Sequence, residues 1–131
     1  MIPYGMNAAR LLPLIVSLLL VGCGTRDPAP LSPVKGRVWY QGQPLTGGMV
    51  VFTPDIQRGG SGPQAWAKIG PDGSFVLMTD ARHGATPGWH RITIATESSA
   101  SLPTHFHDPE QSKQLFEVKA DRPNVCELRL D

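Results

Sequence analysis

The sequence predicts an all-β domain, an immunoglobulin-like or transthyretin-like antiparallel sandwich of about seven strands, preceded by a signal peptide and a proline-rich tether. The chain holds 14 glycines and 13 prolines among its 131 residues, which is a high content for a helical protein. No segment after residue 23 repeats apolar residues at helical spacing. Short apolar runs instead alternate with glycine, proline, asparagine and aspartate, as expected of strands joined by turns.

Residues 1–22 carry the features of a bacterial secretion signal. Arg10 supplies positive charge, and residues 11–21 form an apolar run of 11 residues, interrupted by Pro13 and Ser17. A membrane-spanning helix needs about 20 apolar residues, whereas the apolar centre of a signal peptide needs about 7–15. The run therefore predicts a secretion signal and not a transmembrane anchor.

The apolar run ends in Leu20, Val21, Gly22 and Cys23, which together resemble the lipobox of bacterial lipoproteins. Small residues before the cysteine let a membrane protease reach the backbone, and the thiolate is the nucleophile that accepts a diacylglyceryl group. Two or three acyl chains hold a protein at a membrane without a spanning helix. We expect lipidation at Cys23, and a protein anchored in the cell envelope that faces the periplasm or the exterior.

The choice of membrane depends on the residue after the lipidated cysteine. Gly24 lacks the acidic character that marks inner-membrane retention in some bacteria, so we favour the outer membrane.

Charge and cysteine content exclude several classes of partner. After residues 1–22 are removed, 11 basic side chains face 11 acidic ones, and no run of Lys and Arg forms a cluster. We therefore expect no nucleic-acid partner and no attraction to acidic lipids. If Cys23 is lipidated, Cys126 has no partner in the chain, which excludes a disulfide framework.

Residues 23–33 are predicted to form the lipidated cysteine and its tether. Pro28, Pro30 and Pro33 favour extended polyproline II, which at about 3.1 Å per residue would hold the domain up to roughly 30 Å from the bilayer. The sandwich domain is then expected over residues 34–131.

The strands of this domain are predicted one after another from their turns. The first spans residues 34–40 and closes at a turn over 41–44, the second spans 49–53, and a glycine-rich loop covers 55–63. Strands over 64–69 and 74–79 flank residues 70–73, where proline, aspartate and glycine predict a tight hairpin turn. A strand over 88–96 precedes a loop over 97–112, with one helical turn near 109–114. Strands over 115–119 and 125–130 are predicted to form a closing hairpin.

Alternation of side chains along each strand predicts the two faces of the sheets. Eight apolar residues should point inward: Val50, Phe52, Phe75, Leu77, Ile92, Ile94, Leu128 and Leu130. Cys126 shares the parity of Leu128 and should be buried with them. Trp39, Trp66 and Trp89 have the opposite parity and should point outward, either as structural cover or as a surface for an envelope protein or a polysaccharide.

The order of the motifs resembles a known family, the short bacterial lipoproteins with a carboxypeptidase-regulatory-like, or transthyretin-like, domain. The series reads VKGRV at 34–38, GQPL at 42–45, VVFTP at 50–54, PDGSF at 71–75 and PGWHRITI at 87–94, followed by LP at 102–103, DP at 108–109 and Asn124. The resemblance covers about residues 34–131. It implies a β-sandwich displayed on the cell envelope and no catalytic site, because such domains are accessory modules in peptidases.

Two features depart from the family pattern. His90 stands where an inward aromatic residue is usual, and His105, Phe106 and His107 replace a Lys-Tyr segment. Histidines two residues apart on a strand share a face and could chelate zinc or copper, given a third ligand such as His83 or Asp80. The alternative, which we favour, is two exposed loop histidines on either side of a buried Phe106, with no metal or other cofactor.

Catalytic motifs are not evident in the sequence. Ser98, Ser99 and Ser101 lie in a loop and not at a strand–turn–helix elbow, and the glycines near residue 60 lack the lysine of a phosphate-binding loop. We therefore expect a non-enzymatic, lipid-anchored envelope protein with a structural or interaction role. The alternatives are a glycan- or small-ligand-binding module and a metal-binding periplasmic protein.

Overall fold

The computed structural model describes residues 29–96 and 102–131. The predicted signal, Cys23 and the first part of the tether lie outside these residues, as do Ser98, Ser99 and Ser101. Within the described part of the chain, no helix has the length and apolar character needed to cross a bilayer.

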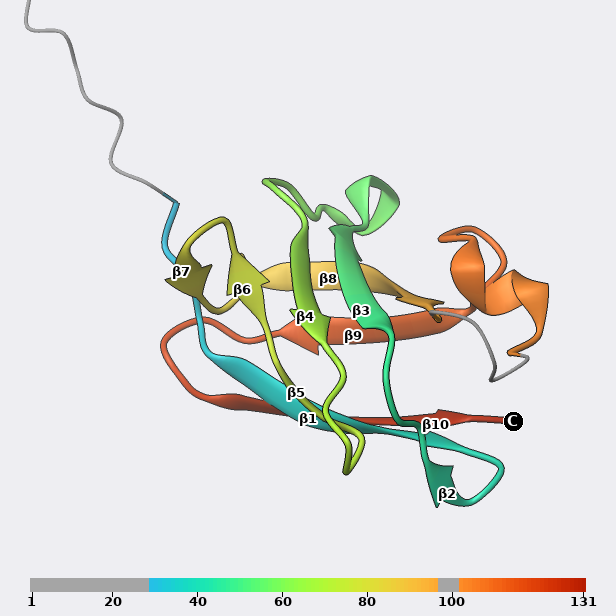
Figure 1. The fold of residues 1–131 in the computed structure, drawn as a ribbon. Helices are drawn as coiled ribbons and strands as arrows, with labels where there is room; N and C mark the ends of the chain where they lie inside the picture. Colours follow the sequence, from blue (N-terminus) through green and yellow to red (C-terminus); the bar gives the residue numbers. More distant parts are fainter. Residues whose placement is uncertain (1–28, 97–101) are drawn as a thin grey trace, which may run out of the picture.

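Two β-sheets pack face to face, which confirms the predicted all-β sandwich (Figure 1). The four-stranded sheet has the order β10-β1-β2, and β5 pairs with β1 beside β2. Its strands are β1 (Val34–Tyr40), β2 (Gln43–Pro44), β5 (Ser74–Val76) and β10 (Asn124–Leu130). The six-stranded sheet has the order β7-β6-β4-β3-β8-β9. Its strands are β3 (Met49–Pro54), β4 (Ala65–Lys68), β6 (Met78–Thr79), β7 (Arg82–His83), β8 (Gly88–Ala95) and β9 (Gln114–Val118).

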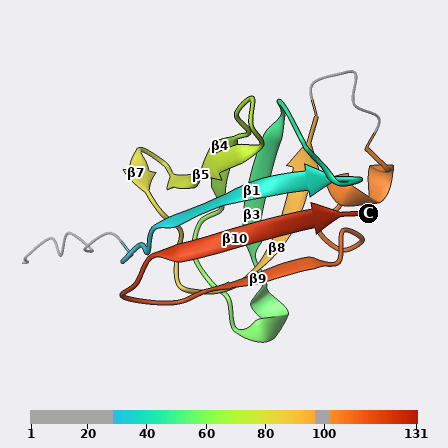
Figure 2. The same ribbon diagram turned by 90° about the horizontal axis from the view of Figure 1, so that it is seen from below.

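The first and the last strand of the domain lie side by side and run parallel. β1 pairs with β10 from Val34 opposite Asn124 to Tyr40 opposite Leu130. Figure 2 shows the two strands together, with β3 and β8 of the other sheet lying across them. All other strand pairs are antiparallel.

The predicted closing hairpin over 115–119 and 125–130 is wrong. β9 pairs with β8 in one sheet and β10 pairs with β1 in the other, so residues 119–123 cross from sheet to sheet. Asn124 holds this crossing, because its side chain accepts from Lys119 N at 2.8 Å and donates to the carbonyl oxygens of Pro33, Lys119 and Arg122. Apolar side chains before and after the crossing thereby enter the core from opposite sheets.

The turn over 70–73 is tight, as predicted, but it does not join a hairpin. Gly73 N donates to Gly70 O at 3.0 Å, and Gly73 has a φ of 82°, which favours glycine. β4, before the turn, belongs to the six-stranded sheet, and β5, after it, pairs with β1. The predicted strand over 74–79 is split at Leu77, after which β6 returns to pair with β4.

Two short 3₁₀ helices lie in the predicted loops. η1 (Ile56–Arg58) interrupts the loop after β3, and η2 (Thr104–His107) comes slightly before the helical turn predicted near 109–114. Ser112 N donates to Asp108 O at 2.8 Å and closes one further turn at that place.

The core between the sheets contains every residue predicted to point inward, Cys126 included. Loops contribute Leu45, Ile69 and Leu102 in addition, and η2 contributes Phe106. Ser32, in the predicted tether, is buried and exchanges two backbone hydrogen bonds with Ala85.

Candidate functional site

Trp39 lies on the outer face of the four-stranded sheet, among charged side chains. Its indole Nε1 donates to Glu127 Oε2 at 2.9 Å. The guanidinium carbons of Arg37 and Arg129 stand 5.8 and 5.7 Å from its ring centre, within reach of cation–π attraction. The half-buried indole is therefore engaged with side chains of β1 and β10.

Trp66 lies on the outer face of the six-stranded sheet and is 41% exposed. It stands opposite Met78 of β6 on one side and Val51 of β3 on the other. Residues directly opposite in adjacent strands share a face, so these three form an apolar row across the sheet. This is the most exposed tryptophan of the three, and large exposed apolar side chains are few among the residues that the structure describes.

Trp89 lies on the same outer face as Trp66 but at another place. It is half-buried and stands opposite Glu117 of β9, at the far side of the sheet from β4. The three predicted surface tryptophans therefore occupy two different sheets, with Trp39 on the opposite side of the sandwich from Trp66 and Trp89. No single flat surface includes all three.

His105 and His107 are held apart from a third ligand. The ring of His105 stacks on buried Phe106 with 4.0 Å between ring centres, and His107 Nδ1 forms a hydrogen bond with Ile94 O. His83 lies on β7, at the opposite edge of the six-stranded sheet from β9. Across residues 29–96 and 102–131, no three His, Cys, Asp or Glu side chains are placed to hold a metal ion.

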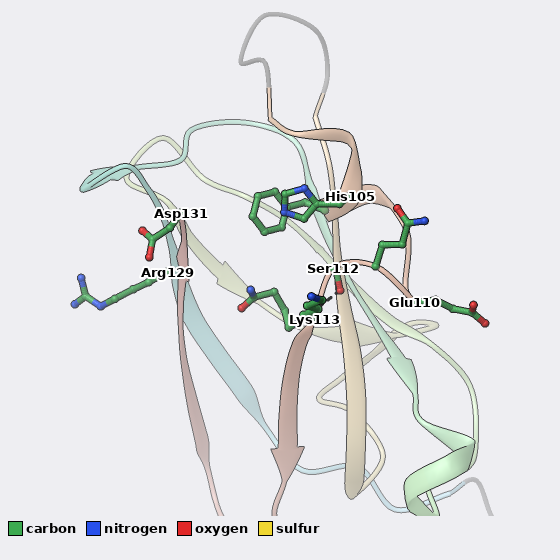
Figure 3. Close-up of a pocket in the computed structure, with 9 residues that line it drawn as sticks. His105, Glu110, Ser112, Lys113, Arg129 and Asp131 are labelled. Atoms are coloured by element: carbon green, nitrogen blue, oxygen red, sulfur yellow. Dashed lines mark hydrogen bonds between the residues drawn. The ribbon is translucent and has the colours of Figure 1, made fainter.

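The histidine segment instead borders a shallow open pocket of about 570 Å³ (Figure 3). His105 and residues 110–114 line one side, and Arg129 and Asp131 at the end of β10 line the other. Its charged groups are of both signs, since Lys113 and Arg129 are basic and Glu110 and Asp131 are acidic. The pocket therefore has no uniform charge that would select one class of ion.

A buried ion-pair cluster, which the sequence did not reveal, holds η1. The carboxylate of Asp55 contacts Arg58 at 2.8 Å and Arg91 at 3.4 Å, and it also accepts from Gln57 N. Burial alone would raise the pKa of Asp55, but the hydrogen bonds from the two arginines outweigh it and the pKa lies below its ordinary value. The cluster fixes a turn that leaves Ile56 83% exposed.

Two further reactive side chains are enclosed in the core. His90 Nε2 bonds to Thr86 O at 2.8 Å and its ring packs against Phe52, with the ring centres 5.8 Å apart. Burial lowers the pKa of His90 and raises the pKa of Cys126 to about 12. Both groups are inaccessible to a substrate.

Comparison with known proteins adds one distant likeness. No protein-family model matches the chain, and no curated protein does. A crystal structure of a DUF3823 family protein from Parabacteroides merdae aligns with a TM-score of 0.46 and 19% sequence identity, over 78% of this chain and 46% of that one. The chain thus spans about half the length of that protein.

No family is assigned on this likeness. The chain is an all-β sandwich by its own structure, and its function must be argued from its own residues.

Proposed function

We propose that the chain is a bacterial lipoprotein, anchored in the cell envelope through Cys23, and that its sandwich domain acts by binding or support and not by catalysis. The observation that carries the proposal is the sequence Leu20, Val21, Gly22 and Cys23 at the end of an 11-residue apolar run. The resemblance of residues 34–131 to carboxypeptidase-regulatory-like lipoproteins supports the same role.

The state of the reactive side chains supports a non-catalytic role. Asp55 is neutralised by two arginines, and His90 and Cys126 are enclosed in the core, so each has a structural use. A general base or nucleophile must instead reach a substrate at hydrogen-bonding distance. The accessible features are sheet faces and shallow pockets, which suit recognition of a partner.

Mass spectrometry of the mature protein tests the anchor. We expect Cys23 at the N-terminus with a diacylglyceryl group, and loss of the protein from the membrane fraction in Cys23→Ala. Cys126→Ala is the matched control, because a buried thiol cannot accept lipid, and this variant should stay with the membrane. Unchanged membrane association of Cys23→Ala contradicts the proposal.

A second candidate, recognition of an envelope polysaccharide, is supported by Trp66. Its exposed indole stands in an apolar row with Met78 and Val51, and Gln64 donates to Thr53 Oγ1 at 3.1 Å beside that row. A flat aromatic face with polar neighbours can stack on a sugar ring and bond to its hydroxyls.

Single tryptophan substitutions test this candidate. Trp66→Ala should weaken retention on insoluble envelope polysaccharide at least tenfold while the melting temperature changes little. Trp39→Ala and Trp89→Ala are the matched controls, because these half-buried indoles lie away from the row. If all three variants and the parent are retained equally, polysaccharide recognition through Trp66 is rejected.

A further inference from the structure

The two sides of the sandwich differ in the length of the strands that form their sheet edges. On one side the edges are formed by β2, β5 and β7, which have two or three residues each. On the other side they are formed by β9 with five residues and β10 with seven. Very short edge strands protect a sheet from pairing with another chain, whereas a long edge strand presents a row of unpaired backbone groups. β10 is the longest such edge in the described part of the chain.

The hydrogen bonds of β10 identify which of its backbone groups are free. Asn124 N donates to Pro33 O at 2.8 Å, and Gln41 N donates to Leu130 O at 3.3 Å. The even-numbered residues of β10 therefore direct their backbone groups to β1. Because backbone groups alternate in direction along a strand, Val125, Glu127 and Arg129 direct theirs to the open side. Among the described residues these groups have no hydrogen-bond partner in the chain.

The outer face of β10, beside its open edge, is exposed along the length of the strand. Val125 is 60% exposed at one end, and Glu127 and Arg129 are exposed as well. At the other end, the shallow pocket of Figure 3 lies between Arg129 and the segment that leads to β9. Within residues 29–96 and 102–131, a pocket and not a packed segment therefore borders this end of the edge.

The charges on this edge match those of a second copy. In an antiparallel pair, residues with free backbone groups must stand opposite one another. A pair that engages at least two of these three residues of β10 has its two-fold axis at position 126, 127, 128 or 129. An axis at Leu128 places Glu127 of each copy opposite Arg129 of the other copy, so the dimer has two such pairs of opposite charges. An axis at Glu127 or at Arg129 places like charges opposite each other, and an axis at Cys126 places Glu127 opposite Val125.

The charge pattern also indicates that Glu127 and Arg129 do more than prevent the edge strand β10 from pairing with another chain. Like charges along an edge strand would repel a second copy in every register, whereas opposite charges two residues apart do not. Arg129 has no ion pair within the described residues, where its guanidinium only stands against the Trp39 ring. On the other edge, in contrast, Lys119 already pairs with Glu117 of its own chain.

We propose that two copies of this chain associate through β10, in an antiparallel pair centred on Leu128, so that the two four-stranded sheets become continuous. Glu127 and Arg129 set the register, and the backbone groups of Val125, Glu127 and Arg129 form the new hydrogen bonds. This proposal goes beyond the proposed function and does not depend on lipidation.

Charge reversal and charge exchange test the proposal on the full-length chain, extracted from whole cells with mild detergent and weighed by sedimentation equilibrium. The parent should have the mass of two chains. Glu127→Arg and Arg129→Glu should each reduce it to the mass of one chain, because like charges then face each other. The double variant Glu127→Arg/Arg129→Glu restores opposite charges in the same register and should return to the mass of two.

Lys35→Glu is the matched control, because it reverses a charge on the same face but on the middle strand β1, and its mass should equal the parent's. Melting temperatures separate loss of pairing from loss of fold, since each single variant also loses a contact with Trp39. A parent with the mass of one chain overturns the proposal. So does a dimer that survives both single reversals, or a double variant that stays monomeric while folded.

Discussion

At the scale of single residues, the core of this domain contains polar groups whose protonation is set by burial. His90 is enclosed with one ring nitrogen bonded to Thr86 O, while its Nδ1 has no hydrogen-bond partner. A charged imidazolium would need partners on both nitrogens, so the neutral ring is the form that fits. This inward position of β8 is therefore occupied by a neutral ring that packs against Phe52.

The low pKa of His90 makes the stability of the domain depend on pH. The native state holds the neutral ring, whereas the unfolded chain binds a proton below its ordinary pKa of 6.5. Stability is therefore complete above pH 6.5 and falls as the pH decreases through 6.5 towards the lower native pKa, by at most about 1.4 kcal/mol per pH unit. Urea unfolding of the parent at pH 7.5 and 5.5 should reveal this fall.

His90→Phe should remove most of the fall in unfolding free energy between pH 7.5 and pH 5.5. This holds even if the variant differs from the parent in stability at pH 7.5. His83→Phe, at an exposed position on β7, is the matched control and should retain the fall. If the stability of the parent and of His90→Phe depended on pH in the same way, His90 would not be the group that causes the dependence.

Cys126 should behave as an inert thiol. With its pKa raised to about 12 from 9.0, the thiolate fraction near pH 8 falls roughly a thousandfold. A disulfide reagent should therefore label the native protein far more slowly than the protein in urea, and Cys126→Ser should lose the urea-dependent signal. Rapid labelling of the native protein would indicate that β10 is open.

At the scale of elements, β1 depends on a glycine for its close contact with two neighbours. A Cβ at Gly36 would stand 2.0 Å from Cys126 O and 2.7 Å from the Phe75 ring. Gly36 lies between these residues in the sheet, opposite Cys126 of β10 and Phe75 of β5. The absent side chain lets the Phe75 ring occupy the space beside β1, where it packs 6.2 Å from the Phe52 ring of the other sheet.

Gly36→Ala should therefore destabilise the domain by about 2 kcal/mol or more, because β1, β10 or the Phe75 ring must move. Lys35→Ala, one residue earlier and exposed, should change the stability by no more than about 0.5 kcal/mol. Thermal or urea unfolding of the two variants measures the difference. Equal stability of the pair would place β1 farther from β10 than the structure has it.

At the scale of the whole molecule, the sandwich is closed by its first and last strands. β10 supplies Asn124, Cys126, Leu128 and Leu130 to the interior. It lies some 90 residues from its partner β1 in the sequence. Contacts of such long range close a large loop at a high entropy cost, and all-β proteins dominated by such contacts fold in about milliseconds to seconds.

A chain that ends at residue 123 should accordingly fail to fold. Loss of two buried leucines alone costs roughly 4–10 kcal/mol, which approaches the entire stability of a small domain. Removal of Asp131 alone is the matched control and should leave the β-type circular dichroism spectrum and the cooperative melting transition intact. A cooperative transition in the shorter chain would refute the closing role of β10.

The sequence by itself determined the buried faces of the longer strands and where these strands lie, but not β2, β7 or the break at Leu77. Side-chain alternation depends only on the backbone of one strand, so Phe52, Ile92, Leu128 and Cys126 could be placed inward without knowledge of any partner. Turn residues likewise act locally, which is why the turn at 70–73 was predicted correctly. The turn predicted over 41–44 is limited to residues 41–42, because Gln43 and Pro44 form β2 and pair with β1. The lipobox and the signal are linear motifs of the same kind and remain predictions from the sequence.

Only the tertiary structure decided which strands pair. A turn fixes the path of its own few residues but not the sheet that the next strand joins, so both predicted hairpins became crossings between sheets. The contact of Asp55 with Arg91, the separation of the three tryptophans over two sheets, and the free edge of β10 all follow from this pairing. They depend on contacts between residues distant in sequence, whose free energy comes from packing the whole core and is not encoded in any local pattern.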